Sequence, residues 1–110
     1  MRNILDKPLW DRKYLNSFRD AACYACGVKD ETVVAAHIRH GQGGGMGMNP
    51  PDDLTLPLCR ACREAQHRVG EHAFWQCHFG GHSVISQDMA VEWAKVCARR
   101  RYETWKESQI

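Results

Sequence analysis

The chain has 110 residues, of which 44% are hydrophobic and 25% are charged, and its formal net charge is +2 with the histidines neutral. These values fit one compact domain over residues 1–110 and exclude a disordered or low-complexity chain. A charge this small neither requires nor excludes a nucleic-acid partner, because a basic face can coexist with a near-neutral total. The sequence contains no run of about 18 apolar residues and no secretory signal core, so we expect a cytoplasmic protein without a membrane partner.

Residues 7–20 are predicted to form a short helix, because apolar side chains recur there at helical spacing. Residues 32–38 begin with β-branched side chains and are predicted to form a strand, as are residues 54–58. Pro57 has no backbone N–H, so the second strand is expected to lie at an edge or to end there. The glycine-rich residues 41–51 between the strands are expected to be neither helix nor regular strand.

Residues 60–70 are predicted to form a second helix, and Phe74 and Trp75 after it are expected to be core anchors. Ser86 is expected to cap a C-terminal helix over about residues 86–105. The apolar face of this last helix is predicted to contain Met89, Trp93, Val96 and Cys97. The predicted fold class is therefore small α+β, with a core at about residues 20–80 and a helix at each end.

Four of the six cysteines form two CxxC pairs, which are Cys23 with Cys26 and Cys59 with Cys62. In a reducing cytoplasm such pairs are metal ligands more often than disulfides, and two CxxC turns complete a tetrahedral site. We therefore predict a structural Zn²⁺ ion, with a chance arrangement or a pair of redox motifs as the alternatives. The remaining Cys77 and Cys97 fit neither pair and are expected to be small buried hydrophobes.

Two histidines are candidates for chemistry, because His37 ends the first strand and His67 lies on the helix that follows the second. A strand pair folded against this helix brings the two together, where with a carboxylate they are predicted to hold one divalent cation. Histidine also suits the role of a general base near neutral pH. Asp53 is the carboxylate expected to hold His37 or touch the cation, whereas Asp52 is expected to cap a turn. His40 is a reserve ligand, and surface or packing roles are expected for His72, His78 and His82.

Several short motifs occur in one order along the chain: AHIRHG at residues 36–41, the glycine-rich loop, PDD at 51–53, LPLCRAC at 56–62, QH at 66–67 and FW at 74–75. Over about residues 14–80 this order resembles the small HNH nuclease-like proteins of phages and prophages, which are related to phage recombination-enhancement nucleases. The resemblance implies a zinc-stabilised ββα-metal (HNH, or His-Me finger) fold with flanking helices. It also implies metal-dependent cleavage or nicking of DNA with Mg²⁺ or another divalent cation, in a bacterial host cell.

By position, His37 matches the strand histidine of that family, which implies a general base, and His67 matches the helix histidine, which implies a metal ligand. Asp53 stands where the asparagine of the HNH motif usually falls. Two positions depart from the family pattern. Arg63 replaces the histidine that usually follows the second helix-side cysteine, and Ala36 replaces an aspartate that many members carry before the strand histidine.

The predicted function is that of an HNH endonuclease, with DNA as the partner and no particular oligomeric state predicted. Guanidinium groups suit bidentate contact with phosphate, so four arginines are expected to bind DNA: Arg39, Arg60, Arg63 and Arg68. A basic run at residues 99–101 fits either a solvated helix end or further phosphate contact. The alternatives are a non-catalytic, zinc-dependent DNA-binding module, which Arg63 favours, and a zinc adaptor that binds protein.

Overall fold

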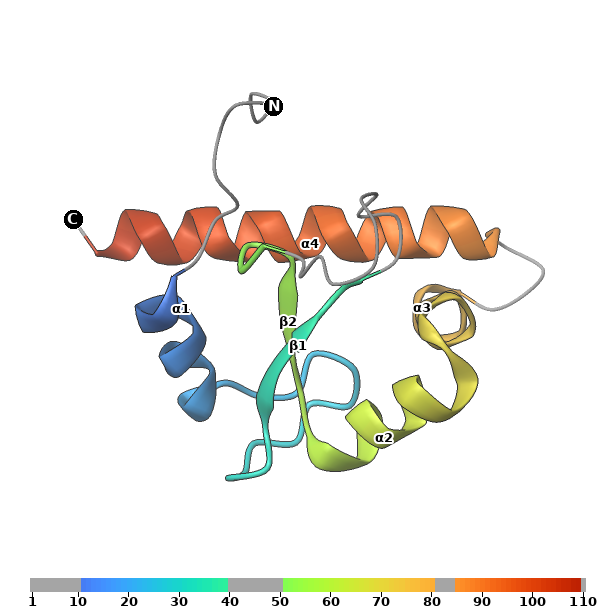
Figure 1. The fold of residues 1–110 in the computed structure, drawn as a ribbon, viewed down its shortest axis with the longest axis horizontal. Helices are drawn as coiled ribbons and strands as arrows, with labels where there is room; N and C mark the ends of the chain where they lie inside the picture. Colours follow the sequence, from blue (N-terminus) through green and yellow to red (C-terminus); the bar gives the residue numbers. More distant parts are fainter. Residues whose placement is uncertain (1–10, 40–50, 81–84, 110) are drawn as a thin grey trace.

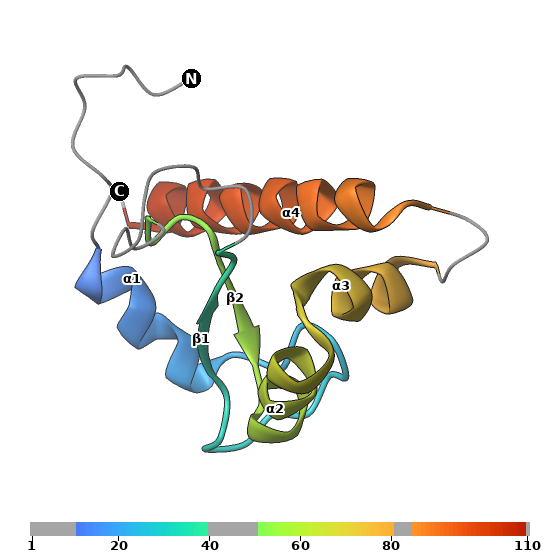
Figure 2. The same cartoon turned by 45° about the vertical axis from the view of Figure 1, so that its right-hand side comes forward.

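The computed structural model describes residues 11–39, 51–80 and 85–109, and the described parts form a small α+β fold. Its elements follow the order α1 (Arg12–Asn16), the 3₁₀ turn η1 (Ser17–Asp20), β1 (Val34–His37), β2 (Thr55–Leu58), α2 (Arg60–Val69), α3 (Glu71–Phe79) and α4 (Gln87–Ser108). The long α4 runs along one side of the molecule, with α1, the two strands and α2–α3 arranged beneath it (Figures 1 and 2). Within the described ranges, no helix is both long and apolar enough to cross a membrane.

The two strands form an antiparallel sheet in which Val34 pairs with Leu58 and His37 with Thr55. Both predicted strands are therefore confirmed, although β1 is shorter than residues 32–38 because Thr32 folds into a turn on the Asp30 carboxylate, at 2.8 Å. The Pro57 carbonyl accepts the backbone N–H of Tyr24 at 2.7 Å, so the backbone of Pro57 faces away from β1. The missing N–H of this proline therefore removes no bond between the strands.

Helix α1 is short, since it gives way at Ser17 to a 3₁₀ turn that ends at Asp20. The helix predicted over residues 7–20 is thus confirmed from Arg12 onward, and its first residues lie outside the described ranges. Asp11 caps the helix, because its side chain accepts the backbone N–H of Tyr14. Tyr14 and Phe18 are buried, as the helical pattern predicts.

The helix predicted from residue 60 is confirmed as α2, and Gly70 ends it with a φ of 91°. A further helix that the sequence pattern did not predict, α3, begins at once after this glycine. Trp75 on α3 is fully buried and Phe74 partly so, which confirms their expected place in the core. Cys77 is exposed, so its expected burial is wrong, and Cys97 is partly buried.

Helix α4 begins as predicted, because the Ser86 hydroxyl accepts the backbone N–H of Met89 at 3.1 Å. Its predicted apolar face is wrong, since Met89, Trp93 and Val96 are 43–49% exposed. The face that α4 buries is lined mainly by small residues and includes Ala90, Val91, Ala94, Ala98 and Tyr102. Because alanine side chains are short, this face brings α4 close to α3 and β2, which it contacts.

Candidate functional site

One CxxC pair precedes β1 in the sequence and the other follows β2, yet the two pairs meet at the start of α2. The first pair lies in a turn in which Gly27 donates its N–H to the Cys23 carbonyl at 2.8 Å and has a φ of 85°. In the second pair, Cys59 is the N-cap of α2 and Cys62 lies in its first turn. The bond from the Tyr24 N–H to Pro57 then ties the first turn to β2, next to the second pair.

The four cysteine sulfurs have the spacing of a tetrahedral metal site. They all lie within 4.8 Å of one another, and the Sγ atoms of Cys26 and Cys59 are 3.7 Å apart. A tetrahedral zinc ion with Zn–S bonds of about 2.3 Å separates its sulfurs by about 3.8 Å. The four cysteines are therefore positioned to bind a metal ion, in agreement with the predicted structural zinc.

Backbone amides prepare part of this cluster for ionisation. Burial raises the pKa of the Cys23 thiol, but the amides of Cys59, Cys26 and Ala25 outweigh burial and lower that pKa to about 7. Burial and the nearby sulfurs raise the pKa of Cys62 instead. Because adjacent thiolates repel one another, a bound cation is needed for all four sulfurs to ionise together.

His37 and His67 line the same cleft, which has a volume of about 400 Å³. The end of β1 contributes His37 and Arg39 to this cleft, and α2 contributes Arg63 and His67. The remaining lining residues are Ala35, Ala36, Gln66, Gly70, Glu71 and His72. The two histidines, one on the strand pair and one on the helix, therefore line a common cleft.

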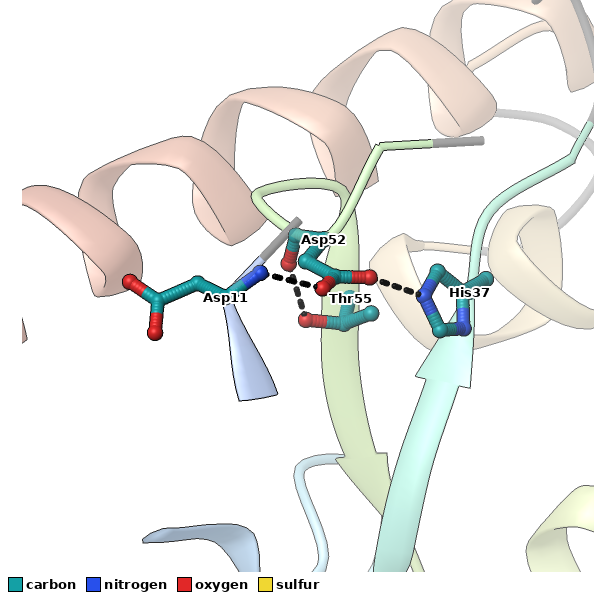
Figure 3. Close-up of polar contacts among 4 residues, drawn as sticks. All are labelled: Asp11, His37, Asp52 and Thr55. Atoms are coloured by element: carbon teal, nitrogen blue, oxygen red, sulfur yellow. Dashed lines mark hydrogen bonds and ion pairs between the residues drawn. The ribbon is translucent and has the colours of Figure 1, made fainter. Parts of the chain in front are cut away.

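The partner of His37 is Asp52, whose Oδ1 lies 3.0 Å from His37 Nε2 (Figure 3). The other carboxylate oxygen of Asp52 accepts the backbone N–H of Asp11 at 2.6 Å, and the side chain of Asp52 is 7% exposed. Thr55 donates its hydroxyl to the Asp52 carbonyl at 2.8 Å, which closes the turn before β2. An ionised carboxylate only accepts hydrogen bonds, so it holds His37 as the tautomer with the proton on Nε2.

Asp52 therefore makes the contact with His37 that the sequence pattern assigned to Asp53. Asp53 lies near two phenols of α1 and α4 instead. Burial is the main reason that the pKa values of Tyr14 and Tyr102 are raised to about 12, and the negative charge of Asp53 adds to both rises. Asp52 and Asp53 are adjacent in a turn, so their side chains have different neighbours.

The comparison with protein families gives a match over residues 6–109 to a family described as a protein of unknown function, DUF968. The chain belongs to the DUF968 family. No curated protein and no solved structure matches the chain. Membership therefore places the chain among relatives of unknown function and assigns it no activity.

Three of the four predicted DNA-binding arginines lie at or beside the cleft. Arg39 and Arg63 line it, and Arg60 lines an adjoining hollow that shares Arg63 and His67 with the cleft. Arg60 also pairs with Glu64 one helical turn away, at 3.1 Å. Arg68 is exposed on α2 but is not among the residues that line the cleft.

The other histidines divide between the cleft, the surface and the parts outside the described ranges. His72 lines the cleft, and its Nε2 lies 3.2 Å from Oδ1 of Asp88 at the start of α4, an exposed contact that fits the expected surface role. His78 is exposed but packs one side of its ring on aromatic neighbours, as expected, and this partial burial lowers its pKa. His40 and His82 lie outside the described residues.

Sequence reasoning missed four residues of this site: Asp11, Asp52, Glu71 and His72. A capping signal marks Asp11, since an aspartate before a helical run is a common N-cap. Nothing in the pattern separates Asp52 from Asp53. Among the described side chains, the cysteine cluster is the one group of three or more potential metal ligands with this close spacing, so the cleft holds no comparable preassembled set.

Proposed function

We propose that this chain is a metal-dependent DNA endonuclease of the ββα-metal (HNH) type, with His37 as its general base. The contact of His37 with the buried Asp52, in a cleft shared with His67 and Arg63, carries this proposal. The order β1, β2, α2 agrees with a ββα unit, and the cysteine cluster lies at the junction of β2 and α2.

The general base needs a ring nitrogen with a free electron pair near neutral pH. With its proton held on Nε2 by Asp52, His37 has that pair on Nδ1. Nδ1 takes a proton from water as the water oxygen bonds to phosphorus, and the bond from phosphorus to the 3′ oxygen breaks. Since one nitrogen does not serve both as base and as metal ligand, we assign His37 to the base role alone.

The positive side chains around the cleft suit a phosphodiester substrate. Arg63 and Arg39 bring guanidinium groups to the same cleft as His37, where they bind the oxygens of the scissile phosphate and its neighbour. His67, which lines the same cleft, is the residue that would hold a divalent cation there. Such a cation, when bound, supplies positive charge to the phosphate and to the departing oxygen.

The cysteine cluster has a structural role in this proposal. Cys59 and Cys62 belong to the start of α2, and the turn of Cys23 and Cys26 is bonded to β2. A zinc ion held by all four would fix the strand pair against α2, and with it the place of His37 relative to His67.

A plasmid-nicking assay with Mg²⁺ or Mn²⁺ tests the function. The wild-type protein is expected to convert supercoiled plasmid to the nicked form, and His37→Ala to lower the rate by about 10⁴-fold or more. His78→Gln is the matched control, because this exposed histidine lies outside the cleft, and it is expected to retain the wild-type rate. Equal nicking by wild type and His37→Ala, or none by the wild type, rejects the mechanism.

One observation favours a second candidate, a non-catalytic, zinc-dependent DNA-binding module. Arg63 stands where the HNH nuclease-like proteins that the chain resembles usually carry a histidine, and the described side chains of the cleft form no cluster of three metal ligands. DNA binding that weakens with rising salt, with no nicking in any divalent cation, is the result expected for this candidate.

A further inference from the structure

Asp11 connects three parts of the chain that are far apart in sequence. Its backbone N–H donates to Asp52 Oδ2 at 2.6 Å, on the carboxylate that holds His37 (Figure 3). Its own Oδ1 accepts the backbone N–H of Tyr14 at 3.0 Å, which caps α1. Its Oδ2 accepts the hydroxyl of Tyr102 on α4 at 3.0 Å, across 91 residues of sequence.

The hydroxyl of Tyr102 is a well-fixed donor, because two aromatic neighbours hold the ring that carries it. Tyr102 is 6% exposed and meets the Tyr14 ring edge-on, with ring centres 4.8 Å apart. Trp105, one turn further along α4, stacks on Tyr102 with ring centres 6.2 Å apart. These contacts hold the phenol in one place, so its bond to Asp11 ties the start of α1 to α4.

The orientation of the Asp52 carboxylate depends on both of its donors. A carboxylate turns easily about its last side-chain bond, so a single contact with His37 leaves it free to rotate. The second bond, from the Asp11 amide, fixes the plane of the carboxylate and so the direction in which it holds the imidazole ring. A shift of Asp11 therefore changes the orientation of His37, although the Asp11 side chain does not contact the cleft histidine.

We propose that Asp11 and Tyr102 are positioning residues for His37, through a chain of contacts that runs from α4 to Asp11, to Asp52 and to the imidazole. The catalytic consequence of this proposal rests on the proposed nuclease function, whereas its effect on the state of the His37 ring does not. In this arrangement α4 helps to form the site, although none of the described residues that line the cleft belongs to it.

Two substitutions remove the bond between Asp11 and Tyr102 from either side. Tyr102→Phe removes the hydroxyl and keeps the ring. Asp11→Ser keeps a good N-cap for α1 but is too short to reach Tyr102, so it separates capping from the contact with α4. Trp105→Phe is the control, because it loosens the same aromatic cluster without touching the hydroxyl.

Nitrogen-15 NMR of the histidine rings and nicking kinetics give two readouts. In both variants the fraction of His37 with its proton on Nε2 is expected to fall, and kcat to fall about three- to tenfold with KM unchanged. The double variant is expected to be no worse than either single one, because both remove the same bond. Trp105→Phe is expected to lower only the melting temperature.

An unchanged His37 tautomer in both Tyr102→Phe and Asp11→Ser overturns the positioning proposal, as does a loss of the same size in Trp105→Phe. If the wild-type protein does not nick DNA, the proposed function fails. The tautomer measurement then still decides whether the state of the His37 ring depends on Asp11 and Tyr102.

Discussion

Replacing Asp52 by asparagine tests the proposed base most directly, because the side chain keeps its shape but loses one acceptor. Two N–H groups donate to the carboxylate, from Asp11 at 2.6 Å and from His37 at 3.0 Å. Asparagine has one oxygen and one NH₂ group. The Asp11 amide can only donate, so we expect the oxygen to face Asp11 and the NH₂ group to face His37.

An NH₂ group beside Nε2 requires that nitrogen to accept, which moves the proton of His37 to Nδ1. The ring then has no free electron pair on the nitrogen proposed to take a proton from water. The same exchange behind a catalytic histidine lowers kcat by about 10⁴-fold, and we expect Asp52→Asn to lower kcat by about 10³- to 10⁴-fold. Because both hydrogen bonds are retained in altered form, the free energy of unfolding is expected to fall by less than about 2 kcal/mol.

Single-turnover nicking of a supercoiled plasmid measures the first effect, and thermal unfolding with nitrogen-15 NMR of His37 measures the other two. Asp53→Asn is the matched control, since it makes the same chemical change one residue away on a carboxylate that lies near Tyr14 and Tyr102. The reasoning is refuted if Asp52→Asn nicks within threefold of the wild-type rate. It is equally refuted if Asp53→Asn is the more damaging change, which would return the role to Asp53.

Two further predictions concern stability. Cys26→Ser is expected to reduce the zinc content from about one ion per chain and to unfold the protein, because a structural zinc contributes on the order of 10 kcal/mol in small domains. Cys77 is exposed, so the control variant Cys77→Ser is expected to retain both zinc and fold. Metal analysis and circular dichroism measure the two outcomes. Burial raises the pKa of Tyr14 from 10.0 to about 12, so its contribution to stability is present below pH 10 and is lost as the pH rises towards 12. Alkaline unfolding curves of Tyr14→Phe should be flatter over this range, and an unchanged slope would contradict the assignment.

Local features of the chain were enough to predict the metal cluster and most of the elements. Each CxxC turn brings its own two sulfurs together, so the tetrahedral group of four forms once the two turns lie side by side. Both strands and α2 followed from side-chain type and periodicity, and the Ser86 cap followed from a hydroxyl before a helical run. These are interactions within a few residues, which depend little on the rest of the fold.

What only the tertiary structure decided were the choices between similar side chains. Asp52 and Asp53 are identical and adjacent, and the turn closed by Thr55 together with the strand register brings the first of them to His37. Met89, Trp93 and Val96 suit a core by hydropathy, yet α4 buries its alanine face because that face allows close approach to α3 and β2. The bond from Asp11 to Asp52 joins residues 41 apart in sequence, and only packing brings so distant a donor to one carboxylate.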